Sequence, residues 1–286
     1  YLLGCGAPQL ASAGLVDGMR IGPDAWGEVG FENVAARYFE AGKWWLNDPD
    51  ALVGTNRPVE QYRAWVTLAA MSGSVLTIGD DLAMLSREKL AILEKILPAR
   101  GRVGRPLDLF QSNPSNIWLL ATEVGSGKSA VLSLFNWGGT EAITHHVNPK
   151  EVLRSQGNVL VYDFWNDYFL GEQSLEISIP PRNVRTLCLV ERVGSPQVLA
   201  ISNYLPQNEW ALNHAAWSKA DKILRGEVTG APGSYLHIAF YVPDGYEPQQ
   251  GRAGSETAFL VKQQKNVWVI PITGTGKPLA WAIEFR

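Results

Sequence analysis

The residues of this chain that could do chemistry follow three short apolar runs within its first fifty positions. Asp24 comes after Met-Arg-Ile-Gly-Pro, and Arg20 stands four residues before it. Gly22 and Pro23 turn the backbone at the end of a predicted strand, so we expect the next side chain to project outward. A nearby cation lowers the pKa of a carboxyl group, and burial raises it. A carboxyl group that must both donate and accept a proton needs such tuning, although an ordinary Asp in a turn, paired with Arg20 at the surface, fits the same pattern.

Two further polar groups follow the neighbouring apolar runs. Cys5 stands between Gly4 and Gly6, and glycines let a ligand approach the backbone closely. No histidine lies near Cys5 to activate it, which disfavours a cysteine nucleophile. Asp48 and Asp50 follow the third run and could share a proton, bind an ion or cap the next segment. Turn formation is the commoner role of Asp around Pro.

Three other motifs favour structural interpretations. Residues 125–129 resemble the end of a phosphate-binding loop, but Thr122 stands where the motif needs glycine, and the following run has strand character. We therefore expect a hairpin turn there. His145 and His146 have no third ligand in range, so no metal site is predicted. For the Asp80-Asp81 pair, as for Asp48 and Asp50, we expect a structural role more than a catalytic one.

The elements that must position these residues alternate over the first hundred positions. Short apolar runs predict four strands, and amphipathic stretches between them predict three helices, the last capped by Ser86. The strands are Tyr1–Leu3, Met19–Ile21, Trp44–Leu46 and Ser74–Ile78, and the helices are Phe31–Glu40, Val59–Met71 and Ser86–Leu97. Such alternation indicates parallel strands with crossover helices. Four such units are half of an eight-stranded barrel, so we expect an incomplete fold or one that a partner completes.

After residue 101 the pattern changes to short β-rich runs separated by turn residues, which indicates an antiparallel β-sandwich. The expected fold class is therefore α/β plus all-β. It combines the second half of a (β/α)8 TIM barrel, strands five to eight, with a C-terminal antiparallel β-sandwich. We expect a half-barrel at 1–103, a β-sandwich domain at 104–195 and a β-rich region at 196–286, either a second sandwich or a continuation of the first.

Composition narrows the function classes. The chain has 286 residues and a formal net charge of -3, which gives no reason to expect a nucleic-acid partner. No apolar run approaches the ~20 residues that cross a bilayer, so no membrane partner is predicted. Cys5 and Cys188 fall in different predicted domains, which disfavours a disulfide. Tyr1 has the character of the start of a buried strand, so we expect the natural N-terminus to be missing.

Three runs in the N-terminal third resemble the second half of the catalytic barrel of the α-galactosidases (melibiases) of glycoside hydrolase family 36, which are related to family 27. They are Gly4 to Pro8, Val16 to Asp24 and Trp45 to Asp50. Asn136-Trp137, residues 163–165 and residues 179–182 resemble the β-sandwich that follows this barrel. The likeness covers about two-thirds of the chain and weakens past about Gln197.

The resemblance implies a retaining exo-glycosidase that hydrolyses terminal α-galactosides without cofactor or metal. Asp24 would be its general acid/base, on barrel strand six. Cys5 on strand five and Arg20 on strand six would contact the sugar. The other implied site residues are the sugar contacts Gly6 and Trp26 and the supporting residues Asp48 and Asp50. The loop that carries Trp26 is shorter than in the family, so the identity of the sugar that fits beside it is left open.

The family's nucleophile is an Asp in a Lys-x-Asp run on strand four. We expect it to be missing from this chain, which alone should then be inactive. The implied partner is a carbohydrate. A secreted or periplasmic location is favoured over a cytoplasmic one, and the oligomeric state is open.

Two alternatives remain at this stage. The same barrel chemistry could act on another sugar, such as a β-L-arabinopyranoside or an α-N-acetylgalactosaminide. The sandwich could instead be a non-catalytic carbohydrate-binding protein, with Trp137, Trp165, Trp210 and Trp217 as a stacking platform. Exposed, coplanar rings would favour the platform, and buried rings would favour a packing role.

Overall fold

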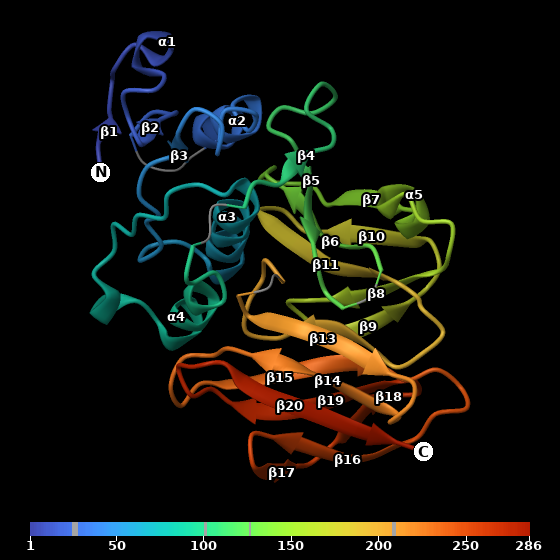
Figure 1. The fold of residues 1–286 in the computed structure, drawn as a ribbon. Helices are drawn as coiled ribbons and strands as arrows, with labels where there is room; N and C mark the ends of the chain where they lie inside the picture. Colours follow the sequence, from blue (N-terminus) through green and yellow to red (C-terminus); the bar gives the residue numbers. More distant parts are fainter. Residues whose placement is uncertain (25–27, 100–101, 126, 208–209) are drawn as a thin grey trace. The chain divides into compact units, whose positions relative to one another are not determined.

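The computed structural model describes residues 1–24, 28–99, 102–125, 127–207 and 210–286 (Figure 1). The described chain forms two compact units. The first unit consists of residues 1–120, 132–145 and 176–185, and the second consists of residues 121–131, 146–175 and 186–286. Each unit is described by itself. Trp26, one of the predicted sugar contacts, lies outside the described residues.

Three short parallel strands begin the first unit, in the order β1-β2-β3. Parallel neighbours require a crossover connection, and here each crossover contains a helix, α1 after β1 and α2 after β2. The bounds are β1 Leu3–Gly4, α1 Gln9–Ser12, β2 Gly18–Arg20, α2 Glu28–Ala36 and β3 Leu46–Asp48. A parallel bridge between Leu52 and Ile78, and a 2.8 Å bond from the Val75 N–H to the Asn47 carbonyl, continue this pairing beyond β3.

Helix α3 (Val59–Ser72) follows, and most of its side chains are buried. It begins after Pro58 and ends at Gly73, which has φ +63°. A Cβ on Gly73 would lie 2.5 Å from the carbonyl oxygen of Arg102, so both the backbone conformation and the close approach require glycine. The 3-10 turn η1 (Leu82–Met84) and helix α4 (Arg87–Glu94) come next. Helix α4 is capped by Ser86, whose Oγ accepts the Lys89 N–H at 3.3 Å, as predicted.

The middle of the chain is mainly β-structure, with one short helix. A six-stranded sheet has the order β4-β5-β6-β11-β8-β9, and β10 pairs with β7. The bounds are β4 Arg105–Pro106, β5 Ile117–Thr122, β6 Ser129–Asn136, β7 Ile143–Val147, α5 Pro149–Leu153, β8 Val159–Asp163, β9 Tyr168–Gly171, β10 Leu175–Ile179 and β11 Asn183–Glu191. Strands β5 and β6 are consecutive in the chain and adjacent in the sheet, in line with the hairpin expected between them. Ser126, in that connection, lies outside the described residues.

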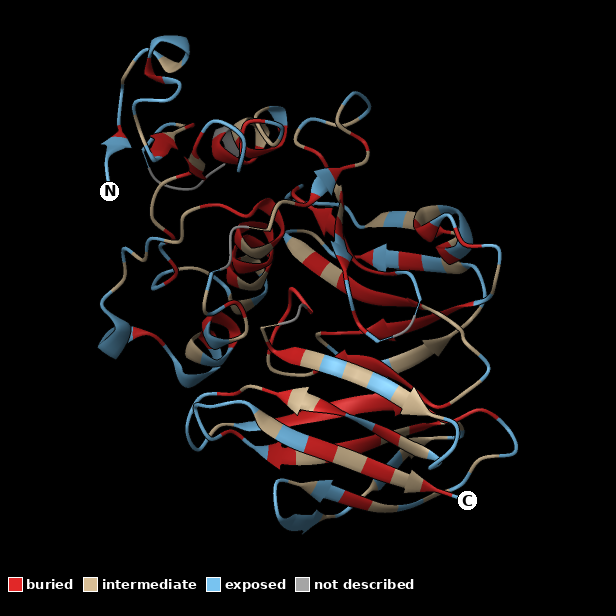
Figure 2. Cartoon of the chain, viewed as in Figure 1, coloured by how far each residue is buried: buried red, intermediate tan, exposed pale blue. Residues whose placement is uncertain are grey.

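The end of the chain contributes two antiparallel sheets to the second unit. Their orders are β12-β15-β19-β18 and β13-β14-β20-β16-β17. The bounds are β12 Gln197–Ile201, β13 Leu212–Ser218, β14 Ile223–Val228, β15 Tyr235–Tyr241, β16 Pro248–Ala253, β17 Glu256–Ala258, β18 Val261–Gln264, β19 Val267–Thr273 and β20 Leu279–Phe285. Both sheets place alternate apolar side chains in one core, which includes Phe240, Ile270, Trp281 and Ile283. The alternating burial along these strands is visible in Figure 2.

Several predicted elements of the first unit have different bounds. The prediction that a buried strand starts at Tyr1 was wrong. Tyr1 is 77% exposed, and β1 covers only Leu3–Gly4. The helix expected to reach Glu40 ends at Ala36, where the Arg37 guanidinium instead donates to the Ile21 carbonyl. The strand expected at 74–78 is reduced to one bridge. The strand expected at Trp44–Leu46 is displaced to Leu46–Asp48, and pairing reaches only two or three residues of each strand.

Candidate functional site

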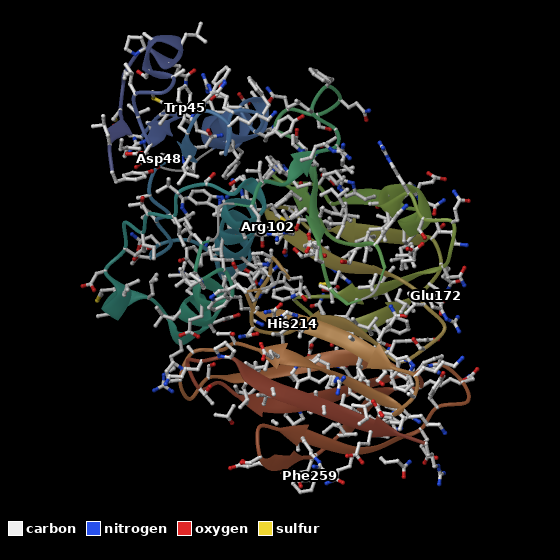
Figure 3. All side chains as sticks on the ribbon, in the orientation of Figure 1. Trp45, Asp48, Arg102, Glu172, His214 and Phe259 are labelled. Atoms are coloured by element: carbon white, nitrogen blue, oxygen red, sulfur yellow. The ribbon has the colours of Figure 1, made fainter. Side chains whose placement is uncertain are left out.

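The register of the parallel sheet places two of the predicted site residues side by side. Arg20 ends β2 and is paired with Asp48, which ends β3. Successive residues of a strand point to opposite faces, so paired residues of neighbouring strands share a face. Asp48 lies in the N-terminal part of the chain, as Figure 3 shows. The sheet therefore brings Arg20 and a carboxylate together at the carboxyl ends of adjacent strands.

The Arg20 guanidinium forms ion pairs with three carboxylates. Its Nε lies 3.3 Å from Asp48 Oδ2, its Nη2 2.9 Å from Asp50 Oδ1, and its Nη1 3.2 Å from Asp24 Oδ1. The three carboxylates differ in exposure, since the Asp48 side chain is 3% exposed, the Asp50 side chain 19% and the Asp24 side chain 100%. Two carboxylates thus fix the cation from within, and the third reaches solvent. We call these four residues the Arg20 cluster.

The charge of Arg20 is stabilised by this surrounding. Burial by itself would lower the pKa of its guanidinium, but the hydrogen bond to Asp48 and the negative charges of Asp48 and Asp50 outweigh burial and raise that pKa above its ordinary value. Arg20 therefore stays protonated. It is a fixed positive charge and a fork of N–H donors beside the exposed Asp24 carboxylate.

Asp50 holds its place through an unusual backbone conformation. Its φ is +81°, in the left-handed region that favours glycine, and its N–H donates to Asp48 Oδ1 at 2.9 Å. An Asp tolerates this region better than most residues because its side chain is short and polar. The strain is offset by the bond to Asp48 and the ion pair to Arg20. The chain turn at residues 48–50 thus orients both carboxylates toward one guanidinium.

The other predicted contacts surround the same strand ends. Cys5 directly follows β1, is exposed and carries a free thiol. Cys5 makes the smallest of the contributions that raise the pKa of the Arg20 guanidinium, so the two side chains are neighbours. Gly6 has φ +67°, and a Cβ there would have no described atom within 4 Å, so the backbone borders open space. The structure brings Cys5, Arg20, Asp24, Asp48 and Asp50 to one end of the parallel sheet.

A second carboxylate cluster in the first unit has a structural role. Asp80 accepts hydrogen bonds from the Gly54 N–H at 2.6 Å and from the N–H and hydroxyl of Thr55 at 2.8 and 2.5 Å. Lys89, whose side chain is buried, donates to the carbonyls of Gly54 and Thr55 at 2.6 and 3.2 Å. Burial raises the pKa of Asp80, but these hydrogen bonds and the Lys89 charge outweigh it and lower that pKa.

Asp80 and Lys89 therefore clamp the loop at residues 54–55 from two sides. Burial, with a contribution from the Asp80 charge, raises the pKa of the neighbouring Tyr62 to about 12. Asp81 caps η1 by accepting the Ala83 N–H at 3.0 Å. The turn and capping roles expected for Asp80 and Asp81 agree with these contacts. The part that Lys89 plays was not predicted. Lysine is rarely buried, and the half-apolar helix that carries Lys89 gave no signal that this one would be.

The remaining sequence motifs have packing roles or no site. Trp137 is buried, stacks on Phe31 and Phe135 at centroid distances of 4.2 and 4.5 Å, and donates from Nε1 to the Ser115 carbonyl. In the second unit, Trp210 and Trp217 pack against the apolar core, and none of the four tryptophans is an exposed ring. These features favour packing over a stacking platform. Among the described residues, no group of three or more His, Cys, Asp or Glu side chains is placed to hold a metal ion.

No helix in the described part of the chain is long and apolar enough to span a membrane. No protein-family model matches the chain. Among solved structures, it is similar to α-galactosidase I from Mortierella vinacea, with a TM-score of 0.48 and 17% identity over 63% of this chain and 54% of that one.

The chain is also similar to the isomalto-dextranase of Arthrobacter globiformis T6, with a TM-score of 0.48 and 15% identity over 94% of this chain and 56% of that one. A family 27 β-L-arabinopyranosidase from Geobacillus stearothermophilus has a TM-score of 0.46 and 16% identity, over 67% of this chain and 49% of that one. The chain thus spans about half the length of each of these glycosidases. At such identities the likeness concerns the fold alone.

Proposed function

We propose that the Arg20 cluster is the terminal-sugar site of a retaining exo-glycosidase that acts on α-galactosides. One observation carries the proposal. A guanidinium fixed by two enclosed carboxylates stands beside a fully exposed third carboxylate, Asp24, at the carboxyl ends of parallel strands. In parallel α/β folds this is the end where catalytic groups gather. The order of the motifs around these residues, which resembles family 36, supports the same function.

The proposed roles follow from position and exposure. Arg20 Nη1 and the exposed Cys5, both at the carboxyl ends of the parallel strands, contact hydroxyls of the terminal sugar. Asp48 and Asp50 hold Arg20 in place. Asp24 donates a proton to the glycosidic oxygen as the bond to the anomeric carbon breaks, and then takes a proton from the incoming water. The second carboxylate of a retaining mechanism attacks the anomeric carbon, and none of the described residues is assigned to that role.

The ion pair between Arg20 and Asp24 bears on this mechanism. An adjacent cation favours the ionised carboxylate, whereas the first step needs a protonated one. Because Asp24 is fully exposed, its pair with Arg20 is well screened and weak. A sugar hydroxyl that accepts from Arg20 Nη1 would therefore compete with Asp24 for the guanidinium.

The fold that accompanies this function is also a proposal. We propose that residues 1–103 form the second half of a (β/α)8 barrel, that residues 104–195 form a β-sandwich domain and that residues 196–286 form a further β-rich region. The parallel pairing of β1, β2, β3 and the Leu52–Ile78 bridge supports the first part. The shared core of two antiparallel sheets supports the last.

The test is sugar binding by the 286-residue chain, which does not require turnover. Saturation-transfer NMR with methyl α-D-galactopyranoside is expected to give a signal that Arg20→Lys reduces, because a lysine cannot reproduce the guanidinium fork. Methyl α-D-glucopyranoside, the C4 epimer, should bind more weakly. A matched variant, Arg252→Lys, changes a solvent-exposed arginine of the second unit and should leave the signal unchanged. Equal signals from wild type and Arg20→Lys would contradict the proposal.

The same experiment separates the related sugars. Methyl β-L-arabinopyranoside lacks the C6 group of galactose, and methyl α-N-acetylgalactosaminide carries a larger group at C2. A stronger signal from either one would keep the roles of Arg20 and Asp24 and change the substrate. If none of the four sugars gave a signal, the proposal of a sugar site at the Arg20 cluster would be contradicted.

A further inference from the structure

A hollow of about 660 Å³ lies in the second unit, where the edge of one sheet meets the strand ends of the other. One side is the hairpin of β16 and β17, which is the edge of the five-stranded sheet. The other side is made by the start of β15 and the end of β19. Its lining residues are Tyr235, residues 253–259, residues 271–273, Thr275 and Leu279.

Two exposed aromatic side chains border this hollow. Tyr235 is 70% exposed and Phe259 is 83% exposed, and Figure 3 shows Phe259 projecting beyond the ribbon of its hairpin. A single exposed ring on a protein surface is ordinary. Two such rings on one concavity offer flat apolar faces to a ligand, which is the combination typical of small-molecule sites. A pyranose ring has a flat face of C–H groups that fits an aromatic face.

Polar groups with free hydrogen-bonding capacity lie beside the two rings. Thr273 is paired with Tyr235 in the antiparallel register of β15 and β19, so its hydroxyl and the Tyr235 ring share one face. Ser255 and Glu256 stand at the tip of the hairpin. In the part of the chain that the structure describes, the side chains of Thr273, Ser255 and Glu256 have no hydrogen-bond or ion-pair partner. Hydroxyls both donate and accept, as the hydroxyls of a sugar do.

The geometry of the hairpin keeps this side of the hollow open. Gly254 has φ +60°, and a Cβ there would lie 3.0 Å from Leu279 Cδ1. The Gly254 N–H donates to the Ala280 carbonyl at 2.7 Å, which ties the turn to the neighbouring strand. The residues beyond the turn, Ser255 and Glu256, are thereby presented at the rim. The charge of Glu256 disfavours anionic ligands.

We propose that this hollow binds a neutral pyranose chain, with Tyr235 and Phe259 as stacking platforms and Ser255, Glu256 and Thr273 as hydrogen-bonding groups. The proposal stands on the second unit alone and does not depend on the Arg20 cluster. A second copy of this chain is a less suitable occupant, because unpaired hydroxyls and a carboxylate would lose water on burial without fixed partners. The function of the site would be to hold a polysaccharide on the surface of the second unit.

The test is electrophoresis of the 286-residue chain in native gels that contain soluble guar galactomannan, dextran or polygalacturonate. Wild type is expected to be retarded by one or both neutral polysaccharides and not by the anionic one. Phe259→Ala and Tyr235→Ala should each weaken the retardation about tenfold, which corresponds to about 1.4 kcal/mol of lost stacking. Phe259→Tyr, which keeps a ring, should retain it.

Two matched variants control for the loss of an exposed ring elsewhere. Phe110 is 97% exposed and Tyr168 is 52% exposed, and neither lines the hollow, so Phe110→Ala and Tyr168→Ala should be retarded like wild type. All variants are also run in an Arg20→Lys background, so that a failure of the first sugar site is distinguished from a failure of this one. Thermal melting establishes that each variant is folded.

Three outcomes would overturn the proposal. One is that neither neutral polysaccharide retards the wild type. Another is an equal loss in Phe110→Ala and Phe259→Ala. The third is self-association of wild type in sedimentation velocity that Phe259→Ala abolishes, which would assign the aromatic rings to a contact between copies of the chain.

Discussion

The two candidate sites of this protein use opposite physical means. In the first unit, paired strand ends gather one cation and three carboxylates, and two of the carboxylates are largely enclosed. In the second unit, an edge hairpin and two strand ends present aromatic rings, hydroxyls and a single carboxylate, that of Glu256, around an open hollow. The first arrangement fixes charges in place and is costly to disturb. The second leaves its groups exposed, so its residues can change with little effect on folding.

The largest expected effect concerns the enclosed ion pair. Arg20→Ala leaves the carboxylate of Asp48, which is 3% exposed, without its cation, and breaking a buried pair costs about 3–5 kcal/mol. Arg252→Ala is the matched change in the second unit. The side chains of Arg252 and Glu284 are 56% and 43% exposed, so its expected cost is ~0–1 kcal/mol. Urea denaturation measures both, and equal costs would remove the contrast between the units.

A smaller loss of stability is expected when a side chain that holds a loop is changed, and the chain offers a charged example, Asp80, and a neutral one, Gln207. Asp80 secures residues 54–55 as a carboxylate, whereas Gln207 secures residues 201–204 through its amide, with bonds of 2.6–2.8 Å to Ile201 and Tyr204. Asp80→Asn and Gln207→Ala should each lower the free energy of unfolding by roughly 2 kcal/mol at pH 7, because each leaves backbone groups without a partner.

The pH dependence distinguishes these two clamps. The pKa of Asp80 is lowered by folding, so its contribution to stability is fully present above the ordinary Asp pKa and is lost as the pH falls through the lowered value. The difference between wild type and Asp80→Asn should therefore shrink below about pH 4. The difference for Gln207→Ala should not change with pH. Denaturation curves at pH 3 to 7 test this, and a constant Asp80→Asn difference would contradict the account.

The smallest expected effect is on the rings of the hollow. Phe259→Ala and Tyr235→Ala should change the free energy of unfolding by less than about 0.5 kcal/mol, since exposed substitutions away from packed features are usually near neutral. Trp137→Ala is the buried comparison in the first unit and should cost about 3–5 kcal/mol. Denaturant midpoints measure all three. A large loss in Phe259→Ala would assign that ring to packing.

The sequence predicted the two units unequally well, for physical reasons. Alternation in the sequence predicts strands at Ile223–Val228 and Leu279–Phe285, and β14 and β20 have these bounds. Each strand has one face on the core and one toward solvent, a pattern that repeats every second residue. No alternation predicts β13 or β16, because a bulge interrupts β13 between Asn213 and Ala216 and β16 is mostly polar. The parallel strands of the first unit were located by their apolar runs, but pairing reaches only two or three residues of each.

The candidate site was predicted by residue type and not by arrangement. The spacing of Arg20 and Asp24 indicated a pair, and the structure shows one. The left-handed backbone of Asp50 and the enclosure of Asp48 could not be foreseen, because both depend on how β2 and β3 align. The hollow at Tyr235 and Phe259 was not predicted either. Its residues come from four segments whose proximity depends on sheet order.

The most direct test of the central claim, that a sugar occupies the Arg20 cluster, is the alkylation rate of Cys5. This thiol is exposed, whereas Cys188 is fully buried and burial raises its thiol pKa, so iodoacetamide should modify one cysteine per native chain. Methyl α-D-galactopyranoside at a saturating concentration is expected to slow that modification severalfold, and methyl α-D-glucopyranoside much less. An unchanged Cys5 rate at a galactoside concentration that saturates binding would place the sugar elsewhere and contradict the account.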